Sequence, residues 1–306
     1  MRQSVTPRRT SRPCAAPTPD VPELPETETI ARDLDAMVGG ASITGVVVRR
    51  PDVLREGSAD AFAEAVSGTR VLRAWRRAKL VVLDLARAPT RDDHSHTADW
   101  HFVVQPRFTG GLLVDDGTVD ERERAYVAVT LLLADGRSLH YRDVRRLGTV
   151  TVMSPARWSE YEGALGIEPL DPRLGDAEFS ALLRSSRTPI KIFLMDQRRL
   201  AGIGNIYGNE ALWRSEIDPS REARSLTSAE ASRLRVELRD TLLASIDARG
   251  TSFRDYRDAR GERGRFVEQL AAYGRAGEPC LRCGRRLVGT HAVDGRSTVF
   301  CPTCQR

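Results

Sequence analysis

Two Cys-x2-Cys pairs near the C-terminal end of the chain are spaced to bind a metal ion. The four residues are Cys280, Cys283, Cys301 and Cys304. Each pair can aim two thiolates at one ion from a tight turn, a spacing typical of a structural zinc site. The residues between the pairs are too few to form a core, so metal binding would supply the folding energy. Disulfides, the alternative, are typical of secreted proteins, and we expect one structural Zn2+ instead.

The segment between the cysteine pairs also carries a hairpin signal. Asp294-Gly295 is a dipeptide that favours a two-residue turn between antiparallel strands. A zinc ion would then brace a hairpin that presents Arg296 at its tip. Zinc ribbons of this kind occur in many proteins that are not enzymes, so this module alone predicts binding rather than catalysis.

A glycine motif, Gly202-Ile203-Gly204-Asn205, follows an apolar stretch at residues 190–197. A dinucleotide-binding fold would need a preceding strand and a third glycine, but the stretch has a helical pattern and Tyr207 occupies the third position. Two helices joined by a glycine turn explain the pattern better. Backbone N–H groups at the start of the second helix, with Asn205, would then hold a DNA phosphate. A purely structural helix hairpin is the alternative.

The basic residues are distributed unevenly. Of 47 Lys and Arg residues only two are lysines, Lys79 and Lys191. A lysine in a chain that uses arginine for almost every other basic residue suggests that its position requires a compact ammonium on a flexible stem. Residues 249–306 carry twelve Arg against six acidic residues, a balance that suits a polyanionic partner because Lys and Arg release counterions from phosphates. A solvated basic face is the alternative.

Apolar patterning divides the chain into a strand-rich part and a helix-rich part. Residues 1–21 are rich in Pro, Arg, Ser and Thr without periodicity, which predicts disorder. A helix should follow, with Ile30, Leu34 and Val38 at helical spacing and Gly39-Gly40 at its end. The predicted strands are residues 43–50, 71–75, 80–85, 102–104, 112–114, 125–133, 138–141 and 149–153, with a polar loop at 88–99. The predicted helices are residues 155–165, 176–185, 189–200, 206–214 and 228–247.

This order predicts an α+β fold class, with an antiparallel sandwich or barrel first, helices second and the cysteine module last. No apolar run reaches the 18 or so residues that a membrane span needs. The first twenty residues lack the apolar region of a secretory signal. We therefore expect a cytoplasmic protein with no membrane partner. We also expect it to be a monomer.

Four separated motifs together resemble the formamidopyrimidine-DNA glycosylases. They are Pro-Glu-Leu-Pro-Glu-Thr-Glu at residues 22–28, Arg-Arg-Ala-Lys at 76–79, residues 200–207 with the glycine motif, and Tyr-Gly-Arg at 273–275 running into the cysteine module. The motifs occur in the family's order. The resemblance implies an enzyme of base-excision repair that binds damaged double-stranded DNA and flips a damaged purine out of the duplex.

The resemblance also implies the domain organisation. An N-terminal antiparallel β-sandwich flanked by helices would form the catalytic domain, residues 22–153. A helix–two-turn–helix domain would span residues 155–250, a lesion-capping loop and connection residues 251–270, and the zinc finger residues 271–306. DNA would lie in the cleft between the two halves.

The resemblance assigns catalytic roles to four residues. Family members attack the deoxyribose C1′ with the amine of an N-terminal proline, which corresponds to Pro22, and then nick the abasic site by β,δ-elimination. Glu23 corresponds to the acid/base carboxylate, and Glu26 to a second carboxylate that positions other groups. Lys79, which we expect on a strand, corresponds to a lysine near the lesion phosphate.

Further residues correspond to the family's DNA contacts. Asn205 and Arg296 match the pair that grips phosphate, Arg254 matches a basic residue near the lesion, and we expect Lys191 to contact phosphate. The loop 257–265 matches in length the one that caps an everted purine. Arg145 matches the side chain that fills the hole left by the flipped base.

Two wedge positions depart from the family pattern. Phe108 stands where an intercalating Met is usual, and Leu147 stands where a Phe is usual. Both remain apolar wedges that can hold a DNA kink. Removal of oxidised purines such as 8-oxoguanine and formamidopyrimidines is the expected activity, and the two replacements bear on lesion and opposite-base preference.

The nitrogen of Pro22 is joined to Val21 by an amide bond and cannot attack C1′ in that form. We expect translation to begin at Val21, read as an initiator Met from a GTG codon and then removed. Residues 1–20 would then be untranslated sequence read in frame. A cleavable targeting peptide is the alternative.

Two other functions compete with this reading. One is an endonuclease VIII-like glycosylase for oxidised pyrimidines, which the length of the loop 257–265 disfavours. The other is a zinc-dependent DNA-binding protein without catalysis, which a retained N-terminal segment would favour.

Overall fold

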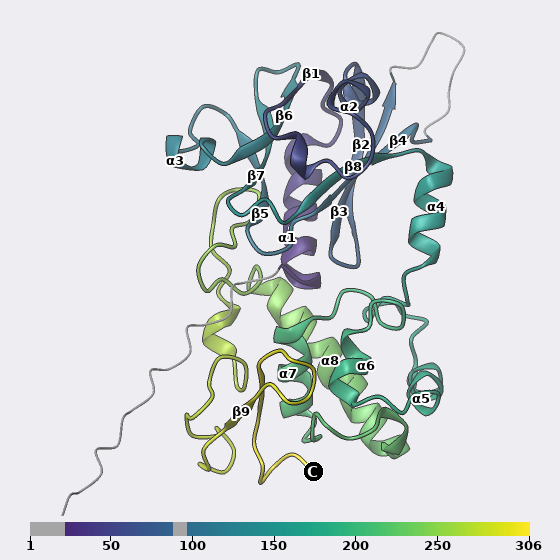
Figure 1. Ribbon diagram of the computed structural model, residues 1–306, viewed down its shortest axis with the longest axis vertical. Helices are drawn as coiled ribbons and strands as arrows, with labels where there is room; N and C mark the ends of the chain where they lie inside the picture. Colours follow the sequence, from purple (N-terminus) through teal and green to yellow (C-terminus); the bar gives the residue numbers. More distant parts are fainter. Residues whose placement is uncertain (1–21, 88–96) are drawn as a thin grey trace, which may run out of the picture.

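The computed structural model describes residues 22–87 and 97–306, so the predicted disorder of residues 1–21 and most of the predicted loop 88–99 lie outside the described residues. Two halves follow one another along the long axis (Figure 1): an upper half of strands and a lower half of helices ending in the cysteine module. None of the helices in these two ranges has the length and apolar character needed to cross a membrane.

The upper half is a sandwich of two four-stranded antiparallel sheets, as the sequence predicted. One sheet has the order β1-β6-β7-β5 and the other β2-β3-β4-β8. The strands are β1 Ile43–Val48, β2 Thr69–Arg77, β3 Leu80–Arg87, β4 Trp100–Gln105, β5 Gly110–Asp115, β6 Val127–Leu133, β7 Ser138–Asp143 and β8 Thr149–Met153.

The apolar residues of strand β3 at positions 80–83 are buried on both faces of the strand. Val81 and Leu83 point into the core between the two sheets. Leu80 and Val82 point to the other face, where Trp158 of α4 (Pro155–Gly163) covers them. A strand buried on both faces has no polar alternation.

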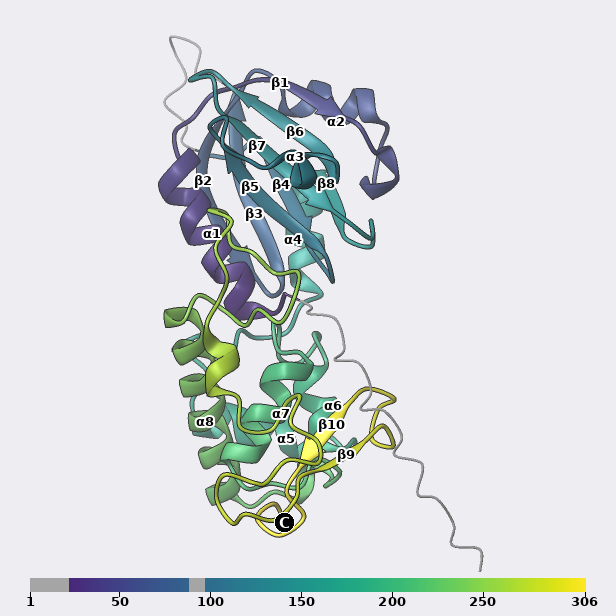
Figure 2. The ribbon, with the colours of Figure 1, turned by 90° about the vertical axis from the view of Figure 1, so that its left-hand side faces the viewer.

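Helix α1 (Leu24–Val38) joins the two halves (Figure 2). Ile30, Leu34 and Val38 pack into the sandwich core, while Leu24 at its first turn belongs to the core of the helical half. Two short helices, α2 (Ala59–Val66) and α3 (Glu121–Arg124), complete this half and were not predicted. Ser58 caps α2 by accepting a hydrogen bond from Ala61 N.

The helical half contains α5 (Asp176–Arg184), α6 (Ile190–Met195), α7 (Asn205–Arg214) and α8 (Ser228–Asp247). Helix α8 has the predicted bounds, and its stripe of Leu234, Leu238, Leu242 and Ile246 is buried. Helix α6 is shorter than predicted and is followed by a turn in which Asp196 accepts a hydrogen bond from Arg198 N.

Two local predictions are wrong. Lys79 lies in the turn between β2 and β3 rather than on a strand. In the cysteine module, β9 (Val288–Thr290) pairs with β10 (Thr298–Phe300), and the connection is residues 291–297 rather than a two-residue turn. Gly295 has φ 75° and donates its N–H to His291 O, so the dipeptide forms one bend within a longer loop.

Candidate active site

The start of α1 and the start of α7 meet at the waist of the molecule. Pro22 is buried and directly precedes Glu23, the N-cap residue of α1. Leu24 N donates to Gly202 O at 3.1 Å, so the two segments are tied by their backbones. The motif at residues 22–28 and the glycine motif at 202–205 are thereby brought together.

The carboxylate of Glu23 occupies the anion site at the N-terminus of α7. Its Oε2 accepts from Gly204 N at 2.6 Å and its Oε1 accepts from Ile206 N at 2.9 Å. These N–H groups are free of intrahelical partners because they begin a helix. We expected them to hold a DNA phosphate, but in this structure they hold Glu23.

The ammonium of Lys79 lies beside Glu23. A Cβ added to Gly204 would overlap both the Glu23 carboxylate and Lys79 Nζ, so the absence of a side chain at residue 204 makes room for this pair. Burial raises the pKa of Glu23, and the Lys79 charge and the helix amides offset this only in part. Burial lowers the pKa of Lys79; the Glu23 charge opposes that shift and Arg296 adds to it.

A cluster of ion pairs clamps the turn that carries Lys79. Ala78 has φ 55°, which is unfavourable for a residue with a Cβ. Glu168 holds this turn from the helical half by accepting from Ala78 N at 2.7 Å, from Arg77 Nη1 at 2.9 Å and from Arg76 Nη1 at 2.7 Å. Glu28 of α1 also pairs with Arg76. The position of Lys79 therefore depends on both halves of the molecule.

Glu26 of α1 is also buried, next to Glu23. Its carboxylate accepts from Tyr207 OH at 2.5 Å, from Thr251 N at 2.7 Å and from Glu23 N at 2.9 Å. Burial raises the pKa of Glu26 from 4.5 to about 7. Glu26 thus holds the backbone N–H of Glu23, the residue expected to act as the acid/base group.

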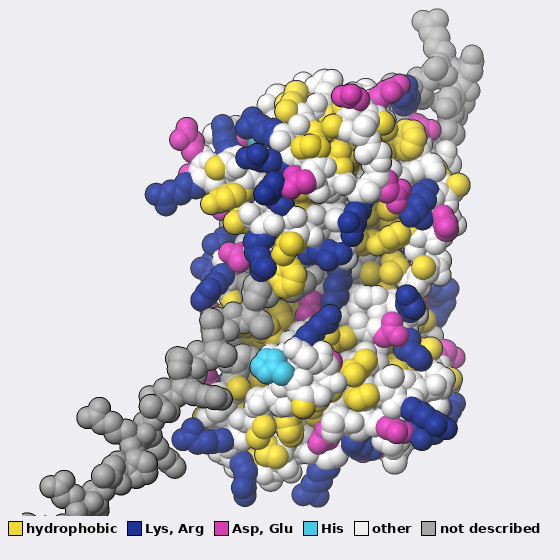
Figure 3. Space-filling model, in the orientation of Figure 1, with side chains coloured by type: hydrophobic (Ala, Val, Ile, Leu, Met, Phe, Trp, Pro, Cys, Tyr) yellow, Lys and Arg dark blue, Asp and Glu magenta, His cyan; other side chains and the backbone are white. Residues whose placement is uncertain are grey.

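The loop 291–297 of the cysteine module reaches the same region. Arg296 is exposed and close enough to Lys79 for their charges to interact. Asn205 Nδ2 donates to Ser297 O at 3.0 Å, so Asn205 and Arg296 lie on adjoining segments. Figure 3 shows Lys and Arg side chains across the waist, where the two halves meet.

The structure corrects the expectation for Lys191. Its side chain is 0% exposed, and Nζ donates to Asp294 Oδ1 at 3.1 Å, to Ser297 O at 3.2 Å and to Thr298 Oγ1 at 2.7 Å. An ammonium has three donors, and all are used inside the protein. Lys191 supports the loop that carries Arg296 instead of meeting a phosphate.

The residues expected to enter DNA form a separate group on the upper half. Arg145 Cζ lies 5.1 Å from the centre of the Phe108 ring, a cation–π distance. Asp143 ties their two loops together by accepting from Thr109 Oγ1 at 2.5 Å and from Gly148 N at 2.8 Å. Leu147 is 41% exposed.

The segment expected to cap a lesion is docked on the upper half. Tyr256 and Ala259 belong to the sandwich core, and Ala259 O accepts from Val114 N at 3.3 Å. Arg249 pairs with both Asp33 of α1 and Asp258 of the loop. Arg254 is exposed at the start of this segment.

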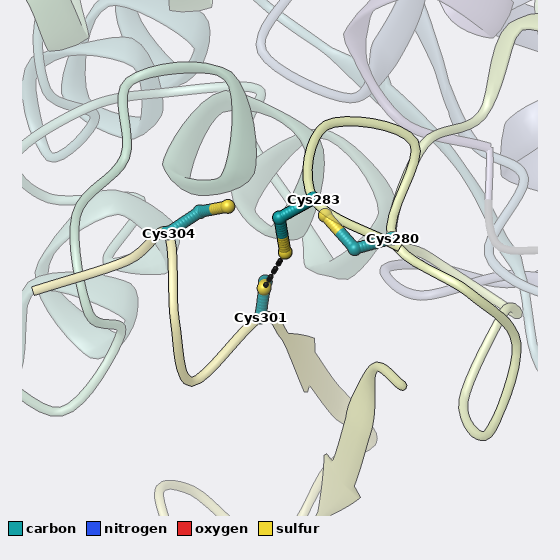
Figure 4. Close-up of side chains that lie close together, drawn as sticks. All are labelled: Cys280, Cys283, Cys301 and Cys304. Carbon is teal, nitrogen blue, oxygen red and sulfur yellow. Dashed lines mark hydrogen bonds between the residues drawn. The ribbon is translucent and has the colours of Figure 1, made fainter. Parts of the chain in front are cut away.

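The four cysteines come together as their spacing predicted (Figure 4). All four sulfurs lie within 4.8 Å of one another, and Cys283 Sγ is 3.5 Å from Cys301 Sγ. Four sulfurs bound tetrahedrally to zinc are about 3.8 Å apart. The donor set and its dimensions therefore fit one Zn2+.

Comparison with known proteins identifies the family. The model of the formamidopyrimidine-DNA glycosylase N-terminal domain matches residues 21–150, that of the formamidopyrimidine-DNA glycosylase H2TH domain matches 165–257, and that of the zinc finger found in FPG and IleRS matches 277–306. The chain belongs to the formamidopyrimidine-DNA glycosylase family. It is a DNA glycosylase of this type acting on damaged DNA, with one structural zinc ion.

Individual glycosylases are similar over most of their length. Formamidopyrimidine-DNA glycosylase from Heliobacterium modesticaldum is 39% identical over 289 residues, covering 94% of this chain and 100% of the relative. The relative from Pelotomaculum thermopropionicum is 36% identical, covering 94% and 99%. A Lactococcus lactis Fpg bound to DNA containing N7-benzyl-Fapy-dG has a TM-score of 0.82 at 28% identity, covering 93% and 100%. A complex of the same protein with abasic-site DNA also has a TM-score of 0.82.

Three residues of this glycosylase site escaped the sequence analysis. Tyr207 stands in the motif at residues 200–207, but the motif does not indicate that its hydroxyl donates to Glu26. Glu168 lies in an irregular segment without periodicity. Glu210 of α7 is 0% exposed and accepts from three consecutive N–H groups at the start of the zinc module, those of Ala271, Ala272 and Tyr273. Glu210 could have been noticed in the sequence, because it is a carboxylate in the middle of an apolar predicted helix.

Proposed function

We propose that this glycosylase removes oxidised purines, 8-oxoguanine and formamidopyrimidines, from double-stranded DNA and nicks the resulting abasic site. The observation that carries the proposal is the arrangement around Glu23: a buried carboxylate follows Pro22, is held by two helix amides, and has the Lys79 ammonium beside it. This arrangement suits a nucleophile that needs a proton donor and a cation next to it.

The first step uses a free secondary amine at Pro22. The nitrogen lone pair forms a bond to the deoxyribose C1′, and the C1′–base bond breaks with its electron pair leaving on the base, which takes up a proton. The Pro22 nitrogen, now an ammonium, loses its proton, and this proton can be the one that the departing base takes up. The nitrogen lone pair then forms a C=N bond to C1′ as the C1′–O4′ bond breaks, Glu23 donates a proton to O4′, and an iminium joins Pro22 to C1′. The raised pKa of Glu23 favours the protonated form that this step requires.

The second step breaks the DNA strand. The iminium withdraws electrons, so the C2′ proton leaves and the bond from C3′ to the 3′ phosphate breaks. Loss of the C4′ proton then breaks the bond from C5′ to the 5′ phosphate. Water hydrolyses the remaining iminium and returns the free amine. Lys79 and Arg296, whose charges are close enough to interact, would bind the phosphates at the lesion.

The DNA would run across the basic waist of the molecule. Phe108, Arg145 and Leu147 would enter the duplex from the upper half, and Asn205 and Arg296 would hold the backbone from the lower half. We propose that the protein acts as a monomer, since each of these groups comes from one chain. The loop 257–265, with Arg254 at its base, would lie over the extruded base.

The test is borohydride trapping, which reduces the iminium to a stable covalent adduct. Chains beginning at Met1 and at Pro22 would be incubated with duplexes containing 8-oxoguanine opposite C, thymine glycol opposite A, or an abasic site. We expect adducts only with the chain beginning at Pro22, and faster trapping on 8-oxoguanine than on thymine glycol. Faster trapping on thymine glycol would indicate the endonuclease VIII-like activity, and binding without any adduct would indicate a non-catalytic DNA-binding protein.

A further inference from the structure

Besides the contact of Ser297 with Asn205 at the start of α7, the zinc module packs against the other end of this helix, away from the active site. The first turn of α7 holds Glu23, as described above, and its last turn contains Trp213 and Arg214. Trp213 packs in one cluster with Cys280, Leu287, Val299 and Cys301. One helix therefore touches both the candidate catalytic carboxylate and the metal-binding cysteines.

The indole of Trp213 has an unused donor. Trp213 is 6% exposed, and its Nε1–H is buried without a well-formed hydrogen bond among the residues that the structure describes. The sulfur of Cys280, which packs in the same cluster as Trp213, is an acceptor close enough to interact with it. An indole N–H can only donate, and a buried donor left without an acceptor is unfavourable.

Arg282 fixes this indole in place. It lies between two zinc ligands in the sequence, and its Cζ is 4.1 Å from the centre of the Trp213 ring. Its guanidinium donates to Trp213 O at 2.5 Å and to Arg214 O at 2.6 Å. These carbonyls end α7, where a cation is favoured by the helix dipole. Arg282 therefore caps the helix and covers the indole at once.

We propose that Trp213 donates its indole N–H to the zinc-bound thiolate of Cys280, and that Arg282 holds the indole in the orientation for this bond. A hydrogen bond from outside the ligand set fixes a ligand's direction and stabilises its charge. Zinc binding would close the contact by drawing Cys280 into the tetrahedral site. The metal would then stabilise the C-terminal end of α7, the helix that holds Glu23 at its other end.

The direct test observes the hydrogen bond by NMR in the full-length protein. Zinc would be replaced by 113Cd, a spin-1/2 nucleus of the same charge, and the indole groups labelled with 15N. The chain has four Trp residues, and the signal absent from Trp213→Phe identifies Trp213. We expect its indole proton to show scalar coupling to 113Cd through the N–H···S–Cd bond. A Trp213 signal without such coupling overturns the proposal.

A second measurement uses the zinc affinity. The metal would be titrated against a chelator in wild-type protein, in Trp213→Phe and in Trp158→Phe, a matched control whose indole packs on β3 in the other half. Loss of a hydrogen bond from outside the ligand set to a ligand weakens metal binding about 10- to 100-fold. We therefore expect Trp213→Phe to bind zinc at least tenfold more weakly than wild type, and Trp158→Phe to bind it with unchanged affinity. An affinity of Trp213→Phe within twofold of wild type overturns the proposal.

Discussion

Removing Glu168 tests whether the ion-pair clamp positions Lys79. The carboxylate accepts three hydrogen bonds from the Lys79 turn, and its side chain is 18% exposed, while Arg76 and Arg77 are 8% and 13% exposed. Breaking a buried ion pair by removing one partner costs about 3 to 5 kcal/mol. Because Glu28 and Glu162 still contact the two arginines, we expect Glu168→Ala to lower the free energy of unfolding by about 3 kcal/mol.

The same change should slow the reaction. Without Glu168, Ala78 loses the acceptor that holds its left-handed conformation, and Lys79 moves away from Glu23. Since a misplacement of about 1 Å can cost about 100-fold, we expect single-turnover nicking of an abasic duplex to slow by about that factor. The free energy of unfolding would be measured in urea.

Glu162→Ala is the matched control for this prediction. Glu162 pairs with the same Arg77, but its side chain is 39% exposed, and exposed pairs contribute about 0 to 1 kcal/mol. If both variants lose equally little stability and nick at the wild-type rate, the clamp does not position Lys79.

Four further predictions follow from the site. Gly204→Ala should reduce the rate of borohydride trapping at least about 100-fold, because the added Cβ would overlap Glu23 and Lys79. Trapping at the wild-type rate would contradict the site geometry. Lys191→Met leaves Asp294 without its cation and should destabilise the zinc module by about 3 kcal/mol, seen as weaker binding of abasic-analogue DNA in fluorescence anisotropy. Burial raises the pKa of Glu26 from 4.5 to about 7. The contribution of Glu26 to the free energy of unfolding is therefore full below pH 4.5 and is lost as the pH rises through 7. Glu26→Gln should remove this pH dependence, which amounts to up to about 3 kcal/mol between pH 4.5 and 7 when unfolding is measured in urea. Removing zinc with a chelator should abolish DNA binding in the anisotropy assay but leave the strand signal of circular dichroism, because the sandwich core and the cysteine cluster are separate.

Periodicity and spacing were sufficient to predict most elements of the fold, but not the short helices α2 and α3. The apolar stripe of α8 predicted that helix, and the spacing of the cysteines predicted the metal cluster. Both predictions were possible because these features depend on local geometry. The helix α2 was missed because only Phe62 and Val66 of its residues are buried, which leaves too little periodicity.

The active site was harder to predict because its contacts join segments far apart in the chain. Glu23 and Gly204 are separated by 181 residues, and Arg76 and Glu168 by 92. The helix amides at residues 204 and 206 do bind an anion, but the sequence could not reveal that a carboxylate of the same chain fills the site. Lys191 was expected to contact phosphate because the sequence does not show that its side chain is buried. That burial depends on its pairing with Asp294, which is distant in the chain.

The most direct test of the central claim locates the covalent bond. A chain beginning at Pro22 would be trapped with borohydride on an abasic duplex, digested, and sequenced by tandem mass spectrometry. Besides the chain terminus the sequence offers only two amines, Lys79 and Lys191, so the site of attachment can be assigned without ambiguity. We expect the deoxyribose remnant on the Pro22 nitrogen. An adduct on Lys79, or the absence of any adduct while DNA is bound, would contradict it.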